Sequence, residues 1–397
     1  MEQTGQVFSM SAPSANQLGS NQSSVREYNE RLILTLLRRV GSLTKADIAR
    51  ITGLSAPTVS VIVGELESEG LLVRGVPVKG KIGQPAVPMS IAEDGVLFLG
   101  LKVGRRSADL ILINFIGKII DRERVVYAYP DPDQVMLFVE QAMIKLKSRL
   151  DPQLRARISG MGIALPGYLW EWASNIGVKP SSMSAWKTID LRQQLANLCN
   201  FPVYQQNDAS CACGAENVFG TLELSRDTLY FYIGHFIGGG VIIDGKLFVG
   251  QTGNAAAIGT LPVVRQGRVG QLVDEASLAK LELLLQRGGS DPSFIFQDPE
   301  NWPIAEPIIH QWVQNCAREL TSAIVSACSI IDFQNVVLDG WLPRPILKKI
   351  VDGIQGSDQF NNWPGIVLPN VLTGSIGPDA RSVGAASLPL SEKFLVN

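Results

Sequence analysis

Cysteine and histidine side chains are few in this chain, and their spacing limits the chemistry that it can perform. The five cysteines include one close pair, Cys211 and Cys213, and the two histidines are His235 and His310. A structural zinc site needs about four nitrogen or sulfur ligands, and a Ser-His-Asp hydrolase needs a histidine base. We therefore expect no metal and no cofactor, and we interpret the cysteines as small buried hydrophobic residues.

Length and composition indicate a globular protein of two or three folding units. The 397 residues exceed an ordinary domain of roughly 100 to 200 residues, and 46% hydrophobic with 18% charged residues is typical of a packed protein. Residues 1–24 are polar and lack periodicity, which predicts a disordered tail rather than a signal peptide. Because no long apolar segment follows, we expect a cytoplasmic protein without a membrane partner.

A helix-turn-helix pattern follows the tail. An apolar stripe at helical spacing predicts the first helix, its members being Ile33, Leu36, Leu37 and Val40. A second helix over 45–51 has Thr44 as its N-cap, and a third over 56–69 has Ser55 as its N-cap. Gly53 lies in the turn between them.

The third helix carries an outward face of small, uncharged side chains. Its inward stripe consists of Val59, Ile62, Val63 and Leu66. The outward face suits a helix that enters the major groove, about 12 Å wide, and touches base edges. The residues expected to contact DNA are Lys45, Ser55, Ala56, Pro57, Thr58, Ser60 and Val61, with Lys79, Lys81 and Gln84 from the loop that follows.

That loop, over 75–85, is rich in Gly, Pro and Lys and joins two predicted strands, 71–73 and 87–91. A flexible basic loop of this kind can follow phosphates or enter the minor groove. We therefore predict a winged helix-turn-helix DNA-binding domain over 25–91. The alternative for this segment is a small helical packing module without a nucleic-acid role.

The remaining residues, 92–397, alternate strands with helices, which predicts an α/β domain of two lobes. Strands are expected over 96–103, 109–114, 119–127, 158–164, 228–233, 239–243 and 336–338, and helices over 132–149, 275–286, 304–328 and 381–387.

Several short motifs in this order resemble the ROK family, which comprises repressors, open reading frames and kinases of sugar metabolism. The motifs are Gly53-Leu54-Ser55, Gly83-Gln84-Pro85, Leu165-Pro166-Gly167, Asn207-Asp208-Ala209, Gly238-Gly239-Gly240 and Asp244-Gly245-Lys246-Leu247. The resemblance implies an actin-like, hexokinase-like fold in which a sugar cleft separates two lobes. It also implies a homo-oligomer, either a dimer or a tetramer.

The chain departs from the family's kinases at three nucleotide positions. The acidic residue of the first phosphate loop is Lys102, the second phosphate loop carries Phe236 in place of a glycine, and the later Gly-Gly is Asp339-Gly340. The resemblance therefore implies that ATP fits poorly, and we expect a protein that is not an enzyme.

The sugar side also departs from the family pattern. Its Glu-x-Gly-His motif is replaced by Ala257-Ile258-Gly259-Thr260, and the cysteine-rich zinc loop is missing. The effector-binding residues that the resemblance implies are Gly167, Ser182, Asn207, Asp208 and Thr260. Trp170, Trp172 and Trp186 are expected near the cleft, where they either stack on a sugar or pack in the core.

These observations predict a DNA-binding transcriptional regulator, and specifically a repressor of carbohydrate-related genes. A sugar or polyol effector would bind in the cleft without being phosphorylated and would change the affinity for a double-stranded operator. One alternative is an active ATP-dependent sugar kinase with an appended DNA-binding head. The other is a DNA binder whose cleft binds nothing.

Overall fold

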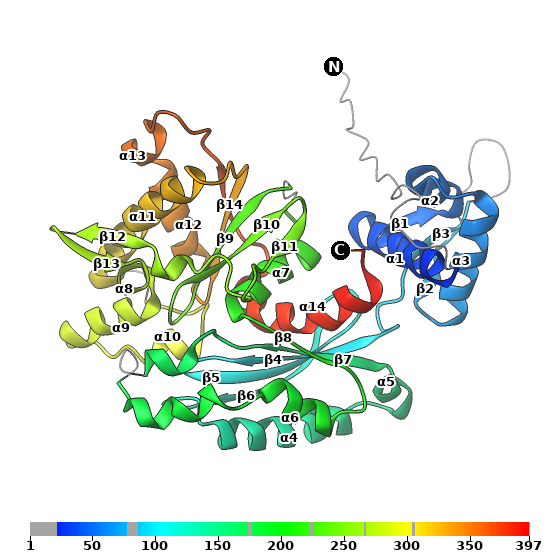
Figure 1. Ribbon diagram of the computed structural model, residues 1–397, viewed down its shortest axis with the longest axis horizontal. Helices are drawn as coiled ribbons and strands as arrows, with labels where there is room; N and C mark the ends of the chain where they lie inside the picture. The colour runs from blue at the N-terminus through cyan, green and yellow to red at the C-terminus, as the bar shows by residue number, and fades with distance from the viewer. Residues whose placement is uncertain are drawn as a thin grey trace.

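The computed structural model describes residues 22–77, 86–173, 177–222, 226–265, 267–303 and 306–396. Figure 1 shows a small N-terminal head beside a larger body whose two sheets lie on either side of a pair of helices. The loop residues Lys79, Lys81 and Gln84, on which the wing prediction rests, lie outside the described residues.

The head has the predicted winged helix-turn-helix order: α1 (Gln22–Val40), β1 (Ser42–Thr44), α2 (Lys45–Thr52), α3 (Ala56–Ser68), β2 (Leu72–Arg74) and β3 (Pro88–Ile91). The strands form one antiparallel sheet in the order β1-β3-β2. The strand β1 was not predicted, because three residues are too few to show a period. The expected caps are confirmed, since the hydroxyl of Thr44 accepts from the Asp47 amide and that of Ser55 from the Thr58 amide.

Two sequence predictions for α1 need correction. The helix begins at Gln22, so the last three residues of the tail predicted over 1–24 are helical. Val40, assigned to the buried stripe, is 53% exposed, because it lies in the last turn beyond the packing surface that buries Ile33 and Leu37.

The first lobe is built on a five-stranded sheet in the order β6-β5-β4-β7-β8. Its elements are β4 (Leu97–Val103), β5 (Ser107–Ile113), β6 (Ile119–Val126), α4 (Pro132–Ser148), α5 (Pro152–Ala156), β7 (Ile158–Ala164), η1 (Leu169–Trp172), η3 (Pro180–Lys187), α6 (Leu191–Leu198) and β8 (Val203–Gln206). Strand β4 is buried throughout, and its side chains alternate between the two faces of the sheet. Leu97, Leu99 and Leu101 pack in the core that includes α4, so Phe98 and Lys102 point to the opposite face.

The second lobe has a five-stranded sheet in the order β11-β10-β9-β14-β15. Its elements are β9 (Thr228–Ile233), β10 (Gly238–Ile243), β11 (Lys246–Phe248), η4 (Ile258–Thr260), β12 (Pro262–Arg265), β13 (Arg268–Gln271), α8 (Val273–Ala276), α9 (Leu278–Arg287), α10 (Phe294–Gln297), α11 (Pro307–Cys328), β14 (Asn335–Gly340), α12 (Arg344–Gln355), α13 (Asp358–Asn361) and β15 (Asn370–Thr373). The long helix α11 and its neighbour α12 contribute many residues to the hydrophobic core on one side of this sheet.

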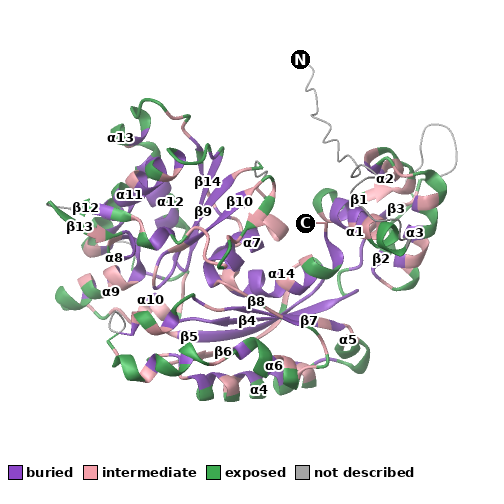
Figure 2. Cartoon of the chain, in the orientation of Figure 1, coloured by how far each residue is buried: buried purple, intermediate pink, exposed green. Residues whose placement is uncertain are grey.

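Two helices, α7 (Asp208–Phe219) and α14 (Ala380–Phe394), pack against each other between the sheets, and η5 (Gly377–Asp379) leads into α14. Much of both helices is buried (Figure 2). Glycine permits this close approach: a side-chain carbon at Gly162 would lie 1.8 Å from the Ala385 carbonyl oxygen, and one at Gly384 would lie 1.8 Å from that of Cys211. The backbone of α14 therefore touches both β7 and α7.

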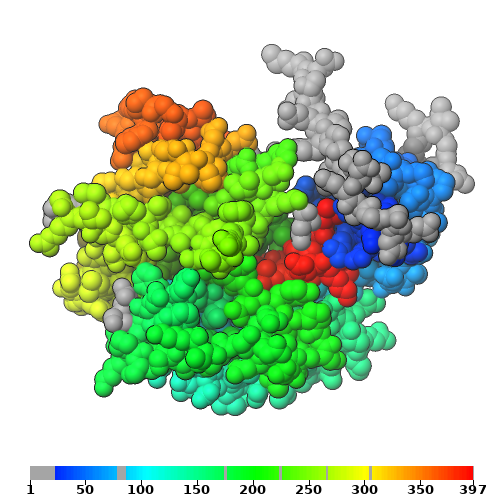
Figure 3. All heavy atoms as spheres, viewed as in Figure 1, coloured from blue at the N-terminus to red at the C-terminus, as the bar shows by residue number. Residues whose placement is uncertain are grey.

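The head is fixed to the C-terminal end of α14. The Val396 amide donates to the Thr35 hydroxyl at 3.0 Å, and both terminal nitrogens of Arg38 donate to the Phe115 carbonyl at 2.8 and 2.9 Å. Phe394 packs against Phe115, with ring centroids 5.1 Å apart. Figure 3 shows the C-terminal residues between the head and the body. One hydrophobic core cluster runs from the head into the body at this joint.

Within the described residues, no single helix is long and apolar enough to cross a membrane, although α2 and α3, bent by 120°, satisfy that test of length and composition together. The five cysteines are free thiols, and all but the half-buried Cys199 are buried.

Candidate DNA-binding face and inter-lobe site

The first half of α3 presents the predicted outward face to solvent (Figure 2). Ala56, Pro57 and Ser60 are exposed, and Val61 is 57% exposed, which is unusual for an apolar side chain. Ser55 and Thr58 are less available, because their hydroxyls lie 2.8 Å apart and hydrogen-bond to each other. Lys45, the first residue of α2, is partly exposed.

The second half of α3 is acidic but neutralised. Glu65 forms an ion pair with Arg26 of α1, and Glu67 binds Arg74 of β2 through two hydrogen bonds of 2.5 and 2.8 Å. These pairs leave the uncharged first half of the helix as the surface that could approach a polyanion.

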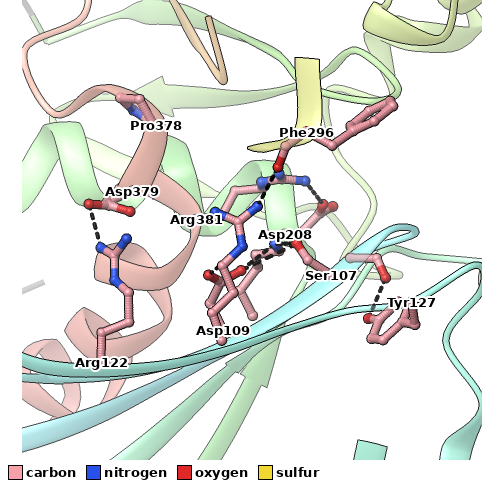
Figure 4. A network of polar contacts seen from close by, with 12 residues as sticks. Ser107, Asp109, Arg122, Tyr127, Asp208, Phe296, Pro378, Asp379 and Arg381 are labelled. Carbon is pink, nitrogen blue, oxygen red and sulfur yellow. Dashed lines mark hydrogen bonds and ion pairs between the residues drawn. The ribbon is translucent and has the colours of Figure 1, made fainter. Parts of the chain in front are cut away.

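A row of charges crosses the first lobe's sheet at its cleft end. Lys102 of β4 stands opposite Asp109 of β5, which stands opposite Arg124 of β6. The Lys102 ammonium lies 2.6 Å from an Asp109 carboxylate oxygen, and the Arg124 Nε lies 3.6 Å from the other oxygen. Figure 4 labels Asp109 in this network. The register of the three strands places these side chains next to one another. Lys102 therefore forms a buried ion pair with Asp109.

Burial shifts the protonation equilibria of this row. It lowers the pKa of the Lys102 ammonium to about 8, although Asp109 acts in the opposite direction. Burial alone would raise the pKa of Asp109, but the charges of Lys102 and Arg124 hold it below its ordinary value.

The two loops that the resemblance equates with the kinase phosphate loops lie against each other. The turn between β4 and β5 carries Arg105, whose guanidinium carbon lies 4.3 Å from the ring centroid of Phe236 in the turn between β9 and β10. Phe236 also stacks on His235, with centroids 5.0 Å apart, and packs near Trp172. The aromatic ring thus fills space that a glycine would leave open.

The predicted pair Asn207 and Asp208 begins α7, at the end of β8. The Asn207 Oδ1 caps the helix by accepting from the amides of Ala209 and Ser210. Asp208 is buried, and its Oδ2 lies 3.2 Å from Nη1 of Arg381, the second residue of α14 (Figure 4). Arg381 was not predicted as a site residue, because 173 positions separate it from Asp208.

The other predicted effector residues are placed differently. A side-chain carbon at Gly167 would lie 3.5 Å from the Asn207 Nδ2 and equally far from the Asn254 Oδ1, so Gly167, Asn207 and Asn254 are neighbours. Asn254 was not predicted as a site residue. Ser182 is partly buried in η3, and the Thr260 hydroxyl donates to the Ala257 carbonyl within its own turn.

The three tryptophans separate into different environments. Trp186 is buried and donates to the Pro130 carbonyl, so it packs in the core. The ring centroid of Trp172 lies 5.2 Å from that of Phe236, beside the cleft. Trp170 packs against Tyr168.

Asp339 at the end of β14 is fully buried and holds the neighbouring loop in place. Its carboxylate accepts from the amides of Gly340 and Gly377 and from the Tyr230 hydroxyl. Burial raises the pKa of Asp339 to about 6. A carboxylate thus occupies the place where the resemblance implies a nucleotide-contacting glycine.

Two hollows lie beside these loops. The inner one, about 30 Å³, is lined by Lys102 and Arg124 of the charged row, by Arg105, Arg106 and His235 of the two loops, and by Arg381. The outer one, about 440 Å³, opens to the surface and shares Arg106 and Phe296 with the inner one. Among the described residues, no three His, Cys, Asp or Glu side chains gather as a metal site requires.

A winged helix-turn-helix joined to a two-lobed body of this topology defines a DNA-binding regulator built on a sugar-kinase scaffold. The chain belongs to the ROK family, whose sequence model matches residues 98–388, and a winged helix-turn-helix DNA-binding model matches residues 26–73.

Comparisons with known proteins agree with this assignment. The chain is 27% identical over 281 residues to a xylose repressor of Caldicellulosiruptor bescii, a match that covers 68% of this chain and 70% of the relative. The crystal structure of a ROK family transcriptional regulator, a homologue of the Escherichia coli MLC protein, has the same fold, with 18% identity and a TM-score of 0.64 over 93% of this chain and 97% of that one. A ROK glucokinase of Streptomyces griseus, in complex with glucose and AMPPNP, shares the fold of the body at 21% identity, with a TM-score of 0.54 over 74% and 98% of the two chains.

Proposed function

We propose that this protein is a cytoplasmic repressor of carbohydrate-related genes, and that a sugar or polyol bound between its lobes controls its affinity for DNA without being phosphorylated. The observation that carries the proposal is a continuous connection between the cleft and the DNA-binding head. The helix α14 begins beside the cleft with Arg381 and ends at Phe394, where it packs against the joint with α1.

The connection is short and closely packed. A helix of 15 residues is about 22 Å long. Pro389 removes one backbone hydrogen bond inside it, but the close contacts at Gly162 and Gly384 hold α14 against β7 and α7. A ligand that changes the angle between the lobes would therefore move the α1 end of α14. Ligand binding and DNA binding would then both favour one of two positions of α14. Allosteric coupling requires such a shared element.

The proposed ligand contacts at the sugar end are Gly167, Asn207 and Asp208, with Asn254 beside them and Ser182 and Thr260 at the margin. An amide and a carboxylate suit vicinal hydroxyls, since the carboxylate accepts and the amide both donates and accepts. The Asn207 Nδ2 is available for this role, because capping uses only its Oδ1.

The proposed absence of kinase activity is supported by the loops opposite. Lys102 is an ion-paired cation where a kinase holds an acidic group, and Phe236 fills the second loop. Asp208, at the position of the kinase base, already accepts from the buried Arg381 guanidinium. The kinase alternative needs that carboxylate to accept a proton from a substrate hydroxyl.

On DNA, we propose a dimer whose two α3 helices enter successive major grooves, with half-sites about 34 Å apart or at a multiple of that spacing. Lys45 and the wing residues Lys79 and Lys81 would contact phosphates, and Gln84 would lie on the same wing.

The substitution Ser60→Glu tests the DNA-binding role. It sets a carboxylate on the outward face of α3 and should lower affinity for an operator selected from random duplexes by at least tenfold, measured by gel shift at fixed salt. The matched control is Ser148→Glu, an equally exposed serine at the end of α4 in the body. Equal affinity of Ser60→Glu and the control would contradict the assignment of α3.

A further inference from the structure

The inner hollow of the cleft is lined by five cationic side chains that come from four separate parts of the chain. Lys102 lies on β4, Arg105 and Arg106 on the turn that follows, Arg124 on β6 and Arg381 on α14. Nearby carboxylates only partly neutralise them: Asp109 pairs with Lys102 and Arg124, Asp208 with Arg381, and Glu282 with Arg106 at 3.7 Å. Five cations against three carboxylates leave an excess of two positive charges.

Several donors in this lining have no hydrogen-bond partner. The Nε groups of Arg105, Arg106 and Arg381 are buried without one, whereas that of Arg124 lacks a hydrogen bond but lies 3.6 Å from its ion-pair partner Asp109. No hydrogen bond from Arg105 to the described residues is found, and its guanidinium lies over the rings of Phe236 and Trp172, within the field of the Asp208 carboxylate. Buried polar groups are ordinarily hydrogen-bonded, so orphan donors that converge on one hollow indicate a missing acceptor.

His235 completes the set. It is 9% exposed, it lines the same hollow, and neither ring nitrogen has a hydrogen-bond partner. Burial, followed by the charges of Arg106 and Arg105, lowers the pKa of this imidazole to about 3, so the ring is neutral at physiological pH. A neutral ring adds a further donor without adding to the positive charge.

We infer that this hollow binds the phosphate group of a phosphorylated sugar or polyol. An excess of two positive charges matches a phosphate ester, which carries about −1.5 to −2 at pH 7. Arginine forks are the groups best suited to phosphate oxygens. In a kinase, this region holds an acidic group that binds metal and nucleotide. Here Lys102, Arg105 and Arg106 make it a site for an anion instead.

The sugar part of such a ligand has a place beside the same hollow. Arg381 lines the hollow and also lies 3.2 Å from Asp208, so one ligand can present hydroxyls to Asn207 and Asp208 and phosphate oxygens to Arg381 and Arg105. The hollow of about 30 Å³ holds about two waters at roughly 10 to 15 Å³ each, so Arg105 and Arg106 must move outward to admit a phosphate. Arg105 is free to do so, because it has no hydrogen bond to break with the described residues.

Inorganic phosphate is the first probe, titrated into the full-length protein by calorimetry at constant ionic strength, with chloride as the reference salt. The parent protein should bind it, and Arg105→Gln should weaken binding by about tenfold or more, the usual effect of losing a charge-assisted hydrogen bond. The control is Arg287→Gln, an exposed arginine outside the hollow, which should bind like the parent. If Arg105→Gln does not fold, Arg106→Gln serves in its place. Absence of phosphate binding, or equal affinity in the Arg105 and Arg287 variants, overturns the inference.

The second arm identifies the source of the phosphate. A panel of hexose and pentose phosphates, their neutral sugars and ATP is titrated in the same way. At least one sugar phosphate should bind about tenfold tighter than inorganic phosphate and than its neutral sugar. If ATP binds more tightly than every sugar phosphate, or a neutral sugar binds as tightly as its phosphate, the ligand class is wrong.

The inference rests on the proposed function, and the two fail separately. If phosphate does not bind but a neutral sugar releases the protein from its operator, the anion site is wrong and the proposed function stands. If phosphate binds in an Arg105-dependent manner but no ligand changes operator affinity, the site stands and the proposed control of DNA binding fails.

Discussion

The two sides of the cleft differ in how far they can still do what a sugar kinase does. At the sugar side, Asn207 and Asp208 stand at the start of α7, with an amide and a carboxylate directed toward Gly167 and Arg381. At the nucleotide side, Lys102 is paired, Phe236 fills a loop and Asp339 is buried against its neighbours. One side presents an amide and a carboxylate, which are suited to hydroxyls, and the other is rich in cations.

The difference indicates which steps of a kinase cycle a sensor needs. In the proposed mechanism, a sugar bound between the two lobes changes their angle, and α14, which contacts both β7 and α1, would carry that change to the head. Phosphoryl transfer requires a metal-bound nucleotide and a free base, neither of which is needed to move a helix. Under the proposal, the cleft transmits a signal without phosphoryl transfer.

The largest effect is expected from Lys102→Met. This change leaves the buried Asp109 carboxylate with the Arg124 Nε at 3.6 Å and the Ser107 hydroxyl at 3.4 Å, and breaking a buried pair costs about 3 to 5 kcal/mol. Chemical denaturation at pH 7.5 measures the loss. The double variant Lys102→Met/Asp109→Leu should recover much of it, because it removes the unpaired charge. Full stability of the single variant would show that the nucleotide side is not held by this row.

A pH-dependent effect is expected from Asp339→Asn. The pKa of Asp339 is about 6 in the folded protein against 3.8 in the unfolded chain, so the folded state binds the proton more tightly. The contribution of Asp339 to stability is complete below pH 3.8 and is lost as the pH rises through about 6, a total of about 3 kcal/mol at 1.36 kcal/mol per unit. The free energy of unfolding of the parent should therefore fall between pH 4 and pH 7 relative to that of Asp339→Asn, whose amide does not titrate in this range. A difference independent of pH would contradict the raised pKa.

A smaller effect tests the sugar side. Asp208→Ala removes the proposed charge-assisted hydrogen bond to a ligand hydroxyl and should weaken effector binding about tenfold to a hundredfold. It also leaves the buried Arg381 guanidinium without its partner at 3.2 Å, so the variant should be less stable than the parent. Operator affinity without effector should remain close to the parent's, while release should need correspondingly more effector because coupling is reciprocal. Calorimetry and gel shift measure the two halves. Unchanged effector affinity would place the ligand elsewhere.

Local patterns in the sequence predicted many of the elements, but not β1, α6 or α12. The caps Thr44 and Ser55 and the strand over 158–164 were predicted as found, because capping and apolar runs are local properties. The resemblance supplied the two-lobed body. The buried stripe failed only at Val40, where tertiary packing, not periodicity, decides exposure.

The polar contacts of the cleft could not be predicted in the same way. The partner of Lys102 depends on the register of β4 with β5, and that of Asp208 on a helix 173 positions away. Asn254 lies on a loop without a periodic pattern. The three substituted nucleotide positions were visible in the sequence, but the excess of positive charge appears only when Arg124 and Arg381 come together.

The central claim is that ligand binding in the cleft, without phosphoryl transfer, controls DNA binding. The most direct measurement titrates the protein–operator complex with sugars and sugar phosphates, with and without magnesium ATP, and follows operator release and ADP in the same sample. We predict release by at least one ligand at the same concentration with or without ATP, and no ADP above background. Turnover at about 1 s⁻¹ or more, or release that requires ATP, would contradict the account.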